Sequence, residues 1–367
     1  MVKKQPEFHL RTTKAFALLA PFLLTAKIVV MSTHPDSQPV ALKSLNIAIL
    51  YSDAKREYFQ TEEHYLTEAE VFHRAQTIAK QLEKDGHHCF LLPGNQDLAE
   101  NLKECKPDMA LNLVDSVYGK EFLSGSIPGL LELLQIPYTG SGILGQSINS
   151  NKYLTKSLMR QYGITTPKFQ LVTSANDEID HLLDYPLIAK LNEVHGSLEI
   201  SRDSICFDEK SLKQVLKRLF ATYDQPVLIE EFIAGKEITA IVAEGGVTKI
   251  YAGERHFLKR SASPFEQIAA YEDVWSDEQT VGYDKYELPL TVKEMIKLTY
   301  SILRLEDYAR FDMRLDQSGR HYIIDANSNP ALGLRNDTAI GTLLDLYGIS
   351  ISTFMERLLR NTLYPNQ

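Results

Sequence analysis

Two stretches near the end of the chain constrain the fold most, because together they predict a β-hairpin that carries acidic side chains. Residues 309–315 alternate between apolar and polar side chains, a turn follows at 316–319 (Asp-Gln-Ser-Gly), and residues 321–326 return as a second strand. Antiparallel pairing brings Asp312 and Asp325 close together, on one face if the register allows. Oxygen ligands of this kind suit Mg²⁺, which usually binds one or two protein carboxylates together with phosphate oxygens of a substrate. The hairpin therefore points to a phosphate-handling enzyme.

The same residues have a second interpretation, which they leave open on their own. Arg310 and Asp312 can form a surface ion pair, and residues 325–330 (Asp-Ala-Asn-Ser-Asn-Pro) can form an ordinary polar turn. Short motifs match by chance often enough that the rest of the chain has to decide between the two interpretations.

The composition is that of a soluble globular protein with two or three domains. Of the 367 residues, 44% are hydrophobic and 24% are charged, so each domain can bury a core of its own. The net charge of −9 argues against nucleic acid as the main partner, because a phosphate-binding surface needs a basic excess. The cysteines Cys89, Cys105 and Cys206 are scattered and odd in number, which favours a reducing compartment over a disulfide framework or a zinc site.

The N-terminal segment looks like a secretory signal. Basic residues between Lys3 and Lys14 precede an apolar run at 15–30. This run is short for a membrane span and is interrupted by Pro21 and Lys27. We expect that translation begins at Met31, that residues 1–44 are a leader, flexible or not translated before Met31, and that the protein is cytoplasmic with no membrane partner.

Strand and helix patterns alternate between residues 45 and 140. An apolar strand at 45–51 precedes a segment at 67–85 with apolar residues at helical spacing, which Gly86 ends. Further strands are expected at 89–92 and 109–114, and further helices at 96–104 and 127–134. Such alternation predicts a parallel α/β sheet.

The pattern changes after residue 141 to a mixture of helices and mostly antiparallel strands, which predicts an α+β arrangement. The expected helices are at 152–162, 176–183, 209–223 and 290–303. The expected strands before the hairpin are at 168–173, 187–191, 199–206, 227–232, 237–244 and 248–254.

Two lysines are candidates for binding phosphate. Lys190 comes at the end of an apolar strand, where a buried ammonium needs an anionic partner. Lys152 opens a helix, where the dipole already favours an anion. The segment at 192–199 contains Gly196 and Ser197, whose amides can point at phosphate oxygens, although with a single glycine an ordinary β-turn is the more common explanation. A solvated surface position remains the alternative for each lysine.

The segment at 227–237 is a candidate for nucleotide binding. It is an apolar strand that runs into acidic residues and Gly235, so its backbone can face the edge of an adenine ring. Glu237 can then accept hydrogen bonds from ribose hydroxyls, or the segment can be a solvated edge.

A glycine pattern at 140–145 (Gly-Ser-Gly-Ile-Leu-Gly) fits the dinucleotide-binding fingerprint by letters only. It does not follow the first strand of its domain, and no acid follows about 20 residues later. We therefore expect no dinucleotide cofactor there.

Taken in order, these segments resemble the ATP-grasp ligases, and within them the D-alanine–D-alanine ligase group. The resemblance runs from about residue 45 to the C-terminus. It is carried by the segments 136–142 (IPYTGSG), 151–152 (NK), 163–167 (GITTP), 186–190 (PLIAK), 228–237 (LIEEFIAGKE), 310–312 (RFD) and 325–330 (DANSNP).

The resemblance implies an ATP-grasp fold of three parts that uses ATP and Mg²⁺, with Mn²⁺ as a possible substitute. These parts are an N-terminal parallel α/β substrate domain at 45–140, a central lid subdomain at 141–230 and a C-terminal catalytic subdomain at 231–367. ATP would lie between the two α+β lobes, and a carboxylate would be activated as an acyl phosphate that an amine attacks. The partners implied are small amino-acid-like substrates and, because relatives are often dimers, a second copy of the chain.

The resemblance also implies a role for each matching residue. Lys152, Lys190 and Ser197 would hold phosphates; Glu230, Glu231 and Ile233 would frame adenine; Glu237 would bind ribose; Asp312, Asp325 and Asn327 would hold Mg²⁺; Arg310 would stabilise the oxyanion; and Glu68 would hold the substrate amino group.

Departures from the family pattern motivate an alternative function. Asp325 stands where the family usually has Glu, the glycine-rich phosphate loop is reduced to residues 196–198, residues 261–275 lack the family's phosphate-binding lysine, and Ala331 stands where the family has glycine. The alternative to a carboxylate–amine ligase is a catalytically weakened pseudoenzyme that binds nucleotide and acts through a protein partner.

Overall fold

The computed structural model describes residues 43–365, apart from residues 197, 202–203, 259–262, 264, 266–267, 269–279 and 336. The expected leader therefore lies outside the described residues except for Lys43 and Ser44. Ser197 and nearly all of the segment 261–275 also lie outside them.

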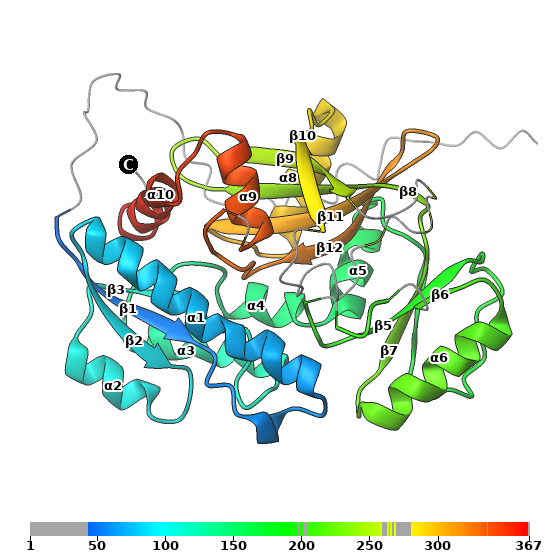
Figure 1. Ribbon diagram of the computed structural model, residues 1–367, viewed down its shortest axis with the longest axis horizontal. Helices are drawn as coiled ribbons and strands as arrows, with labels where there is room; N and C mark the ends of the chain where they lie inside the picture. The colour runs from blue at the N-terminus through cyan, green and yellow to red at the C-terminus, as the bar shows by residue number, and fades with distance from the viewer. Residues whose placement is uncertain are drawn as a thin grey trace, which may run out of the picture. The chain divides into compact units, whose positions relative to one another are not determined.

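The first sheet is parallel, as the alternating pattern predicts (Figure 1). Its strands have the order β2-β1-β3, and their bounds are β1 Asn46–Tyr51, β2 His88–Pro93 and β3 Met109–Leu113. Helix α1 (Glu62–Lys84) begins before the predicted residue 67, because the side chain of Thr61 accepts a hydrogen bond from the amide of His64 and caps the helix. Helices α2 (Leu98–Cys105) and α3 (Ser126–Leu133) share a second apolar core with β1.

Four further helices complete this half of the chain. Within the region of the first sheet, η2 (Arg56–Tyr58) precedes α1 and η3 (Glu121–Gly125) precedes α3, while α4 (Ile143–Asn149) and α5 (Lys152–Gln161) lead from it to the second sheet. Asn151 caps α5, because its side chain accepts a hydrogen bond from the amide of Leu154. Lys152 is therefore the first residue of a helix, as predicted.

The second sheet is antiparallel and has the order β4-β7-β5-β6. The bounds of its strands are β4 Phe169–Val172, β5 Leu187–Leu191, β6 Ile205–Cys206 and β7 Val227–Glu231. One face of this sheet packs on α6 (Glu209–Thr222) through a core that includes Leu187, Leu216 and Ile229.

Two predictions in this region are wrong. Residues 176–183 form turns instead of a helix, because the carboxylate of Asp177 accepts hydrogen bonds from the amides of Thr173 and Ser174. In the predicted strand at 199–206, residues 205–206 form a strand, residues 199–201 and 204 do not, and residues 202–203 lie outside the described part of the chain. The hydroxyl of Ser204 donates to the carbonyl of Glu199.

The third sheet is antiparallel and has the order β10-β9-β8-β11-β12. The bounds of its strands are β8 Gly235–Ala243, β9 Lys249–Phe257, β10 Val281–Lys285, β11 Tyr308–Asp316 and β12 His321–Asn327. The last two strands form the predicted hairpin.

The third sheet has an apolar core on each face. On one face it packs against α5 and α8 (Leu290–Ile302). On the other face it packs against α9 (Ala339–Leu346) and α10 (Ile351–Leu363), in a core that also includes α1 and β1 of the first sheet. This shared core fixes the first sheet against the third.

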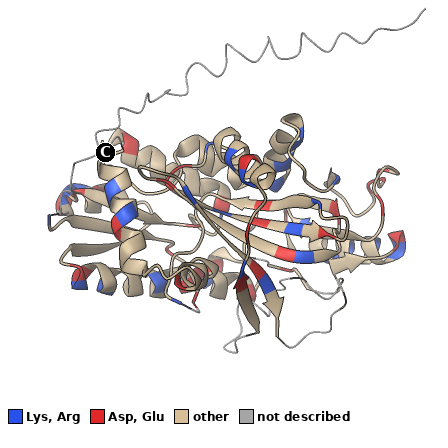
Figure 2. Cartoon of the chain, turned by 90° about the horizontal axis from the view of Figure 1, so that it is seen from above, with Lys and Arg blue, Asp and Glu red and all other residues tan. Residues whose placement is uncertain are grey.

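Acidic and basic residues are interspersed along the helices and strands (Figure 2). Among the described residues, no helix combines the length and apolarity that a membrane crossing requires.

Candidate active site

A cavity of about 580 Å³ is lined by residues of the second and third sheets, by residues of α1 and by Asp115, which lies just after β3. Every predicted site residue that the structure describes lines this cavity. They are Glu68, Lys152, Lys190, Glu230, Glu231, Ile233, Glu237, Arg310, Asp312, Asp325 and Asn327. The structure therefore brings together residues that lie up to 259 positions apart in the sequence (from 68 to 327).

The hairpin places the predicted metal ligands opposite one another. Asp312 and Asp325 are direct cross-strand partners, and Arg310 is the partner of Asn327. The side-chain nitrogen Nδ2 of Asn327 lies 3.4 Å from Oδ2 of Asp312. Directly opposite residues share one face of an antiparallel pair, so the two carboxylates face the same side.

Arg310 and Asp312 also form the ion pair of the second interpretation. The guanidinium Nε and Nη2 of Arg310 donate to Oδ2 of Asp312 at 3.0 and 2.8 Å. Each side chain is 25% exposed, so the pair lines the cavity wall and is not an open surface pair. Burial alone would raise the pKa of Asp312, but Arg310 and Arg255 outweigh it and lower this pKa. Asp312 is therefore an ionised ligand candidate at neutral pH.

This set of side chains fits Mg²⁺. In the described part of the chain, no three His, Cys, Asp or Glu side chains gather around a point where a metal could be held. The protein offers two carboxylates and one amide instead, all with hard oxygen atoms. Mg²⁺ is commonly held in this way, with waters and substrate phosphates completing its octahedral shell.

A buried cluster of two lysines and one acid forms the wall next to the hairpin. The ammonium of Lys156 lies 2.8 Å from Glu230, and Lys190 bonds the other oxygen of the same carboxylate. Burial alone would raise the pKa of Glu230, but the two lysines outweigh it and lower this pKa to about 2. The Glu230 carboxylate, expected to frame adenine, is thus occupied by Lys156 and Lys190. Lys156 was not predicted from the sequence, although it lies one helical turn after Lys152 on the buried face of α5.

Lys152 points into the segment that follows β5. Its ammonium donates to the carbonyl oxygen of Val194, and its amide donates to the carbonyl of Asn192 at 3.1 Å. The helix start and the predicted phosphate segment are therefore in direct contact.

The predicted adenine and ribose residues lie along the end of β7 and the start of β8. Glu231 accepts from Lys168 and from the amide of Asp184, at 2.9 and 3.0 Å. Ile233 lines the cavity between the two strands.

Glu237 lies between two arginines that the sequence analysis missed. Arg255 contacts one carboxylate oxygen at 3.0 Å, and Arg314 contacts the other at 2.9 Å. Both arginines come from other strands of the third sheet, β9 and β11. A local sequence pattern gives no signal for such contacts.

Another part of the cavity wall is acidic. Glu68 on α1 is 4% exposed, and its Oε2 accepts a hydrogen bond from Ser116 at 2.6 Å. Burial, then the charge of Asp115, raises the pKa of Glu68 to about 7. Asp115 accepts a hydrogen bond from the side-chain nitrogen Nδ2 of Asn329 at 3.2 Å. Burial raises the pKa of Asp115 to about 6. The sequence analysis missed Asp115. Its position after the carboxyl end of a parallel strand was the available signal.

The glycine pattern at 140–145 has a packing role in the structure. A side chain at Gly145 would place Cβ 2.1 Å from the carbonyl oxygen of Arg304, so helix α4 can approach this backbone only with glycine at that position.

Comparisons with known proteins identify the family. The family model for the D-ala D-ala ligase C-terminus matches residues 158–360. D-alanine–D-alanine ligase A of Bacillus cereus is 30% identical over 274 residues, which cover 73% of this chain and 84% of that protein. The protein y4sG of Sinorhizobium fredii is 27% identical over 268 residues, which cover 70% of this chain and 78% of that protein.

The structural comparison identifies the fold. The D-alanine–D-alanine ligase from Bacillus anthracis, crystallised in complex with ATP, matches 87% of this chain and 98% of its own length. The TM-score is 0.65 at 24% sequence identity, and the predicted ATP-grasp fold is confirmed. The chain belongs to the D-alanine–D-alanine ligase family of ATP-grasp carbon–nitrogen ligases.

Proposed function

We propose that this protein joins two small amino-acid-like substrates through an acyl phosphate, with ATP and Mg²⁺. One observation carries the proposal: a single cavity is lined by the acids of the hairpin, by Arg310, by Lys152 and Lys190, and by Glu68. Family membership favours this ligase activity over the pseudoenzyme alternative.

The proposed reaction has two steps. A carboxylate oxygen of the first substrate attacks the γ-phosphorus of ATP, and the bond to the β-phosphate oxygen breaks to release ADP. The amine of the second substrate, after losing a proton, attacks the acyl carbon, and the bond from carbon to the phosphate oxygen breaks. The products are an amide, phosphate and ADP.

The part of the cavity that binds the triphosphate is positively charged, which offsets the negative charge that shifts from the γ-phosphate bond during phosphoryl transfer. Lys152 and Lys190 neutralise phosphate oxygens, and Ser197 contributes from the same segment as Val194. Asp312, Asp325 and Asn327 would hold Mg²⁺, which when bound neutralises the triphosphate. Arg310 stabilises the oxyanion that forms at the acyl carbon, a role suited to a permanently charged group held in place by Asp312.

Residues in two other parts of the cavity wall hold the amino acid and the nucleotide in place. Glu68 binds the ammonium group of an amino-acid substrate, with Ser116 orienting the Glu68 carboxylate.

The adenine side of the cavity is lined by Glu230, Glu231 and Ile233. The Glu230 carboxylate contributes there by holding the ammonium groups of Lys156 and Lys190 in position. Glu237 binds the ribose hydroxyls, with Arg255 and Arg314 fixing its carboxylate.

We further propose that the three segments 45–140, 141–230 and 231–367 act as substrate domain, lid and catalytic subdomain, and that the reaction takes place in the cytoplasm. In the structure, Met159 of α5 packs in the core of the third sheet, so α5 anchors the proposed lid to the catalytic subdomain.

The test measures phosphate and ADP release from ATP in the presence of a panel of amino acids that starts with D-alanine, which the name of the Bacillus cereus relative gives as its substrate. Release should depend on both the amino acid and Mg²⁺, and hydroxylamine should trap the acyl phosphate as a hydroxamate. Tight ATP binding without phosphate release by any member of a broad panel would rule the proposal out.

A further inference from the structure

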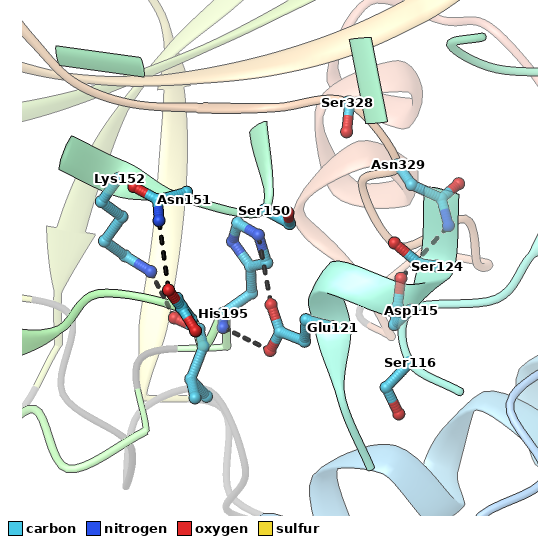
Figure 3. A network of polar contacts seen from close by, with 12 residues as sticks. Asp115, Ser116, Glu121, Ser124, Ser150, Asn151, Lys152, His195, Ser328 and Asn329 are labelled. Carbon is cyan, nitrogen blue, oxygen red and sulfur yellow. Dashed lines mark hydrogen bonds and ion pairs between the residues drawn. The ribbon is translucent and has the colours of Figure 1, made fainter. Parts of the chain in front are cut away.

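Glu121 and His195 connect the first sheet's region of the chain to the segment that follows β5. Glu121 is the first residue of η3, and His195 lies in the segment 192–196. The amide nitrogen of His195 donates to Oε1 of Glu121 at 2.6 Å, and its ring Nε2 lies 3.2 Å from Oε2 (Figure 3). One carboxylate therefore holds both the backbone and the ring of His195.

Burying this carboxylate is costly, which argues for a role. Glu121 is 5% exposed, and burial raises its pKa well above the ordinary range, although the charge of Lys152 acts against this. A buried acid without a strong cationic partner is expensive to keep. A neutral residue would fill the same space at lower cost.

The segment that Glu121 holds also wraps the start of α5. The carbonyl of Val194 accepts from the ammonium of Lys152, and Oε1 of Glu193 accepts from the side chain of Asn151 at 3.2 Å. The side chain of Asn192 accepts from the amide of Tyr153 at 2.9 Å. Figure 3 shows Asn151, Lys152, His195 and Glu121 as neighbours in this network.

We infer that Glu121 is a positioning residue for ATP: through His195 it fixes the segment 192–196, and through Val194 it fixes the ammonium of Lys152. Glu121 itself does not touch the nucleotide. This inference rests on the proposed function for the statement that Lys152 binds phosphate. It adds a physical link between the part of the chain that binds the amino acid and the part that binds ATP.

The first test measures the dissociation constant of a fluorescent ATP analogue for the full chain with Glu121→Ala, His195→Ala and both substitutions. Glu121→Ala removes the acceptor of both contacts and should weaken binding about tenfold, since one buried hydrogen bond is worth about 1.4 kcal/mol. His195→Ala removes only the ring contact and keeps the backbone amide that donates to Glu121, so it should weaken binding less. The double variant should be no weaker than Glu121→Ala, because that substitution already removes both contacts. Independent, multiplying effects would overturn the inference.

Steady-state kinetics separate this role from direct substrate binding. Glu121→Ala should raise the KM for ATP and leave the KM for the amino acid nearly unchanged. A rise in the amino-acid KM alone would instead make Glu121 a substrate ligand and overturn the inference. Glu121→Gln keeps an acceptor for the amide of His195, so it should restore most of the ATP affinity. Glu100→Gln, on the exposed surface of α2, is the matched control and should change neither constant.

Amide hydrogen exchange tests the bridge without any activity. The peptide that contains residues 192–196 should exchange faster in Glu121→Ala than in the parent protein, while β5 exchanges as before. Unchanged exchange in this peptide would overturn the inference even if the protein binds no ATP, in which case the proposed function fails separately. If Glu121→Ala does not fold, Glu121→Met carries the same comparison, because methionine fills the space of the side chain and removes both carboxylate oxygens.

Discussion

The ammonium of Lys156 lies 2.8 Å from the carboxylate of Glu230, and the two side chains are 3% and 1% exposed. Lys190 bonds the second oxygen of the same carboxylate. A single acid thus compensates two lysines at the wall of the cavity. Without that acid, the pair of lysines would repel each other in a region from which water is largely excluded.

We expect Glu230→Gln to destabilise the protein by about 3–5 kcal/mol, because it leaves buried charges without their partner. Denaturant unfolding at pH 7 measures this difference. Since folding lowers the pKa of Glu230 from 4.5 to about 2, its stabilisation is present above pH 4.5 and is lost as the pH falls through 2. The difference between parent and variant should therefore shrink over this range.

The matched control for Glu230 is Glu287→Gln. Glu287 is 88% exposed and pairs with Lys293 at 2.6 Å. Its loss should change the stability by less than about 1 kcal/mol, as for other exposed pairs. Equal effects of the two substitutions would contradict the assignment of Glu230 as the centre of a buried cluster.

Gly145 gives a second stability prediction. Gly145→Ala should destabilise the protein by about 1–3 kcal/mol, because its Cβ would overlap the carbonyl of Arg304. Gly129→Ala is the control: it lies inside α3, its nearest neighbours are side-chain carbons of Ile143 at 3.6 and 3.7 Å, and alanine should stabilise that helix by about 0.5–1 kcal/mol. Thermal unfolding of both variants measures the contrast, and a neutral Gly145→Ala would contradict the packing role.

The parts of the site that the sequence predicted are those that local patterns determine. The hairpin itself follows from the alternation of two neighbouring strands and a short turn. The pairing of Asp312 with Asp325 also depends on a register shift between Asp312 and Met313, which the alternation does not predict. The parallel first sheet likewise follows from the alternation of strands and helices.

The parts that the sequence did not predict depend on contacts between distant segments. Lys156 reaches Glu230 from another element, and Arg255 reaches Glu237 from the neighbouring strand β9. Residues 176–183 have helical spacing, but the turn formed by Asp177 prevails over it. The need for glycine at position 145 is explained by the backbone of Arg304, which is far away in the sequence.

Glu68 predicts the pH dependence of substrate use. Burial and Asp115 raise its pKa to about 7, and only the ionised carboxylate attracts an ammonium group. The kcat/KM for the amino acid should therefore rise with pH up to about 7 and then level off. In Glu68→Gln, kcat/KM should be low and should not rise over this pH range. An identical pH profile in Glu68→Gln would exclude Glu68 as the group responsible.

The same shift in Glu68 has the opposite effect on stability. Because folding raises this pKa, the folded protein holds the proton more tightly, and this contribution to stability is lost as the pH rises from 4.5 through 7. Glu68→Gln should therefore lose less stability than the parent between pH 5 and pH 8, as measured by denaturant unfolding.

The hairpin acids predict the response to Mg²⁺. Asp312→Asn and Asp325→Asn should each raise the Mg²⁺ concentration that gives half-maximal activity, because each removes one charged oxygen ligand. Asp284→Asn is the control, since this acid is 80% exposed on β10. A Mg²⁺ dependence that stays the same in both hairpin variants would remove these residues from the metal site.

Arg310 separates chemistry from binding. Arg310→Ala should lower kcat by about two orders of magnitude or more, the scale expected for the loss of an oxyanion donor, while the affinity for ATP remains. Arg310→Lys keeps the charge but cannot donate in the two directions that Nε and Nη2 use toward Asp312, so its kcat should lie between those of the parent and Arg310→Ala. Lys297→Ala, which removes an exposed cation on α8, should leave kcat unchanged. If Arg310→Ala turns over at the rate of the parent, the oxyanion has another donor; if it loses ATP affinity in proportion to kcat, Arg310 binds the nucleotide and does not act on the acyl carbon.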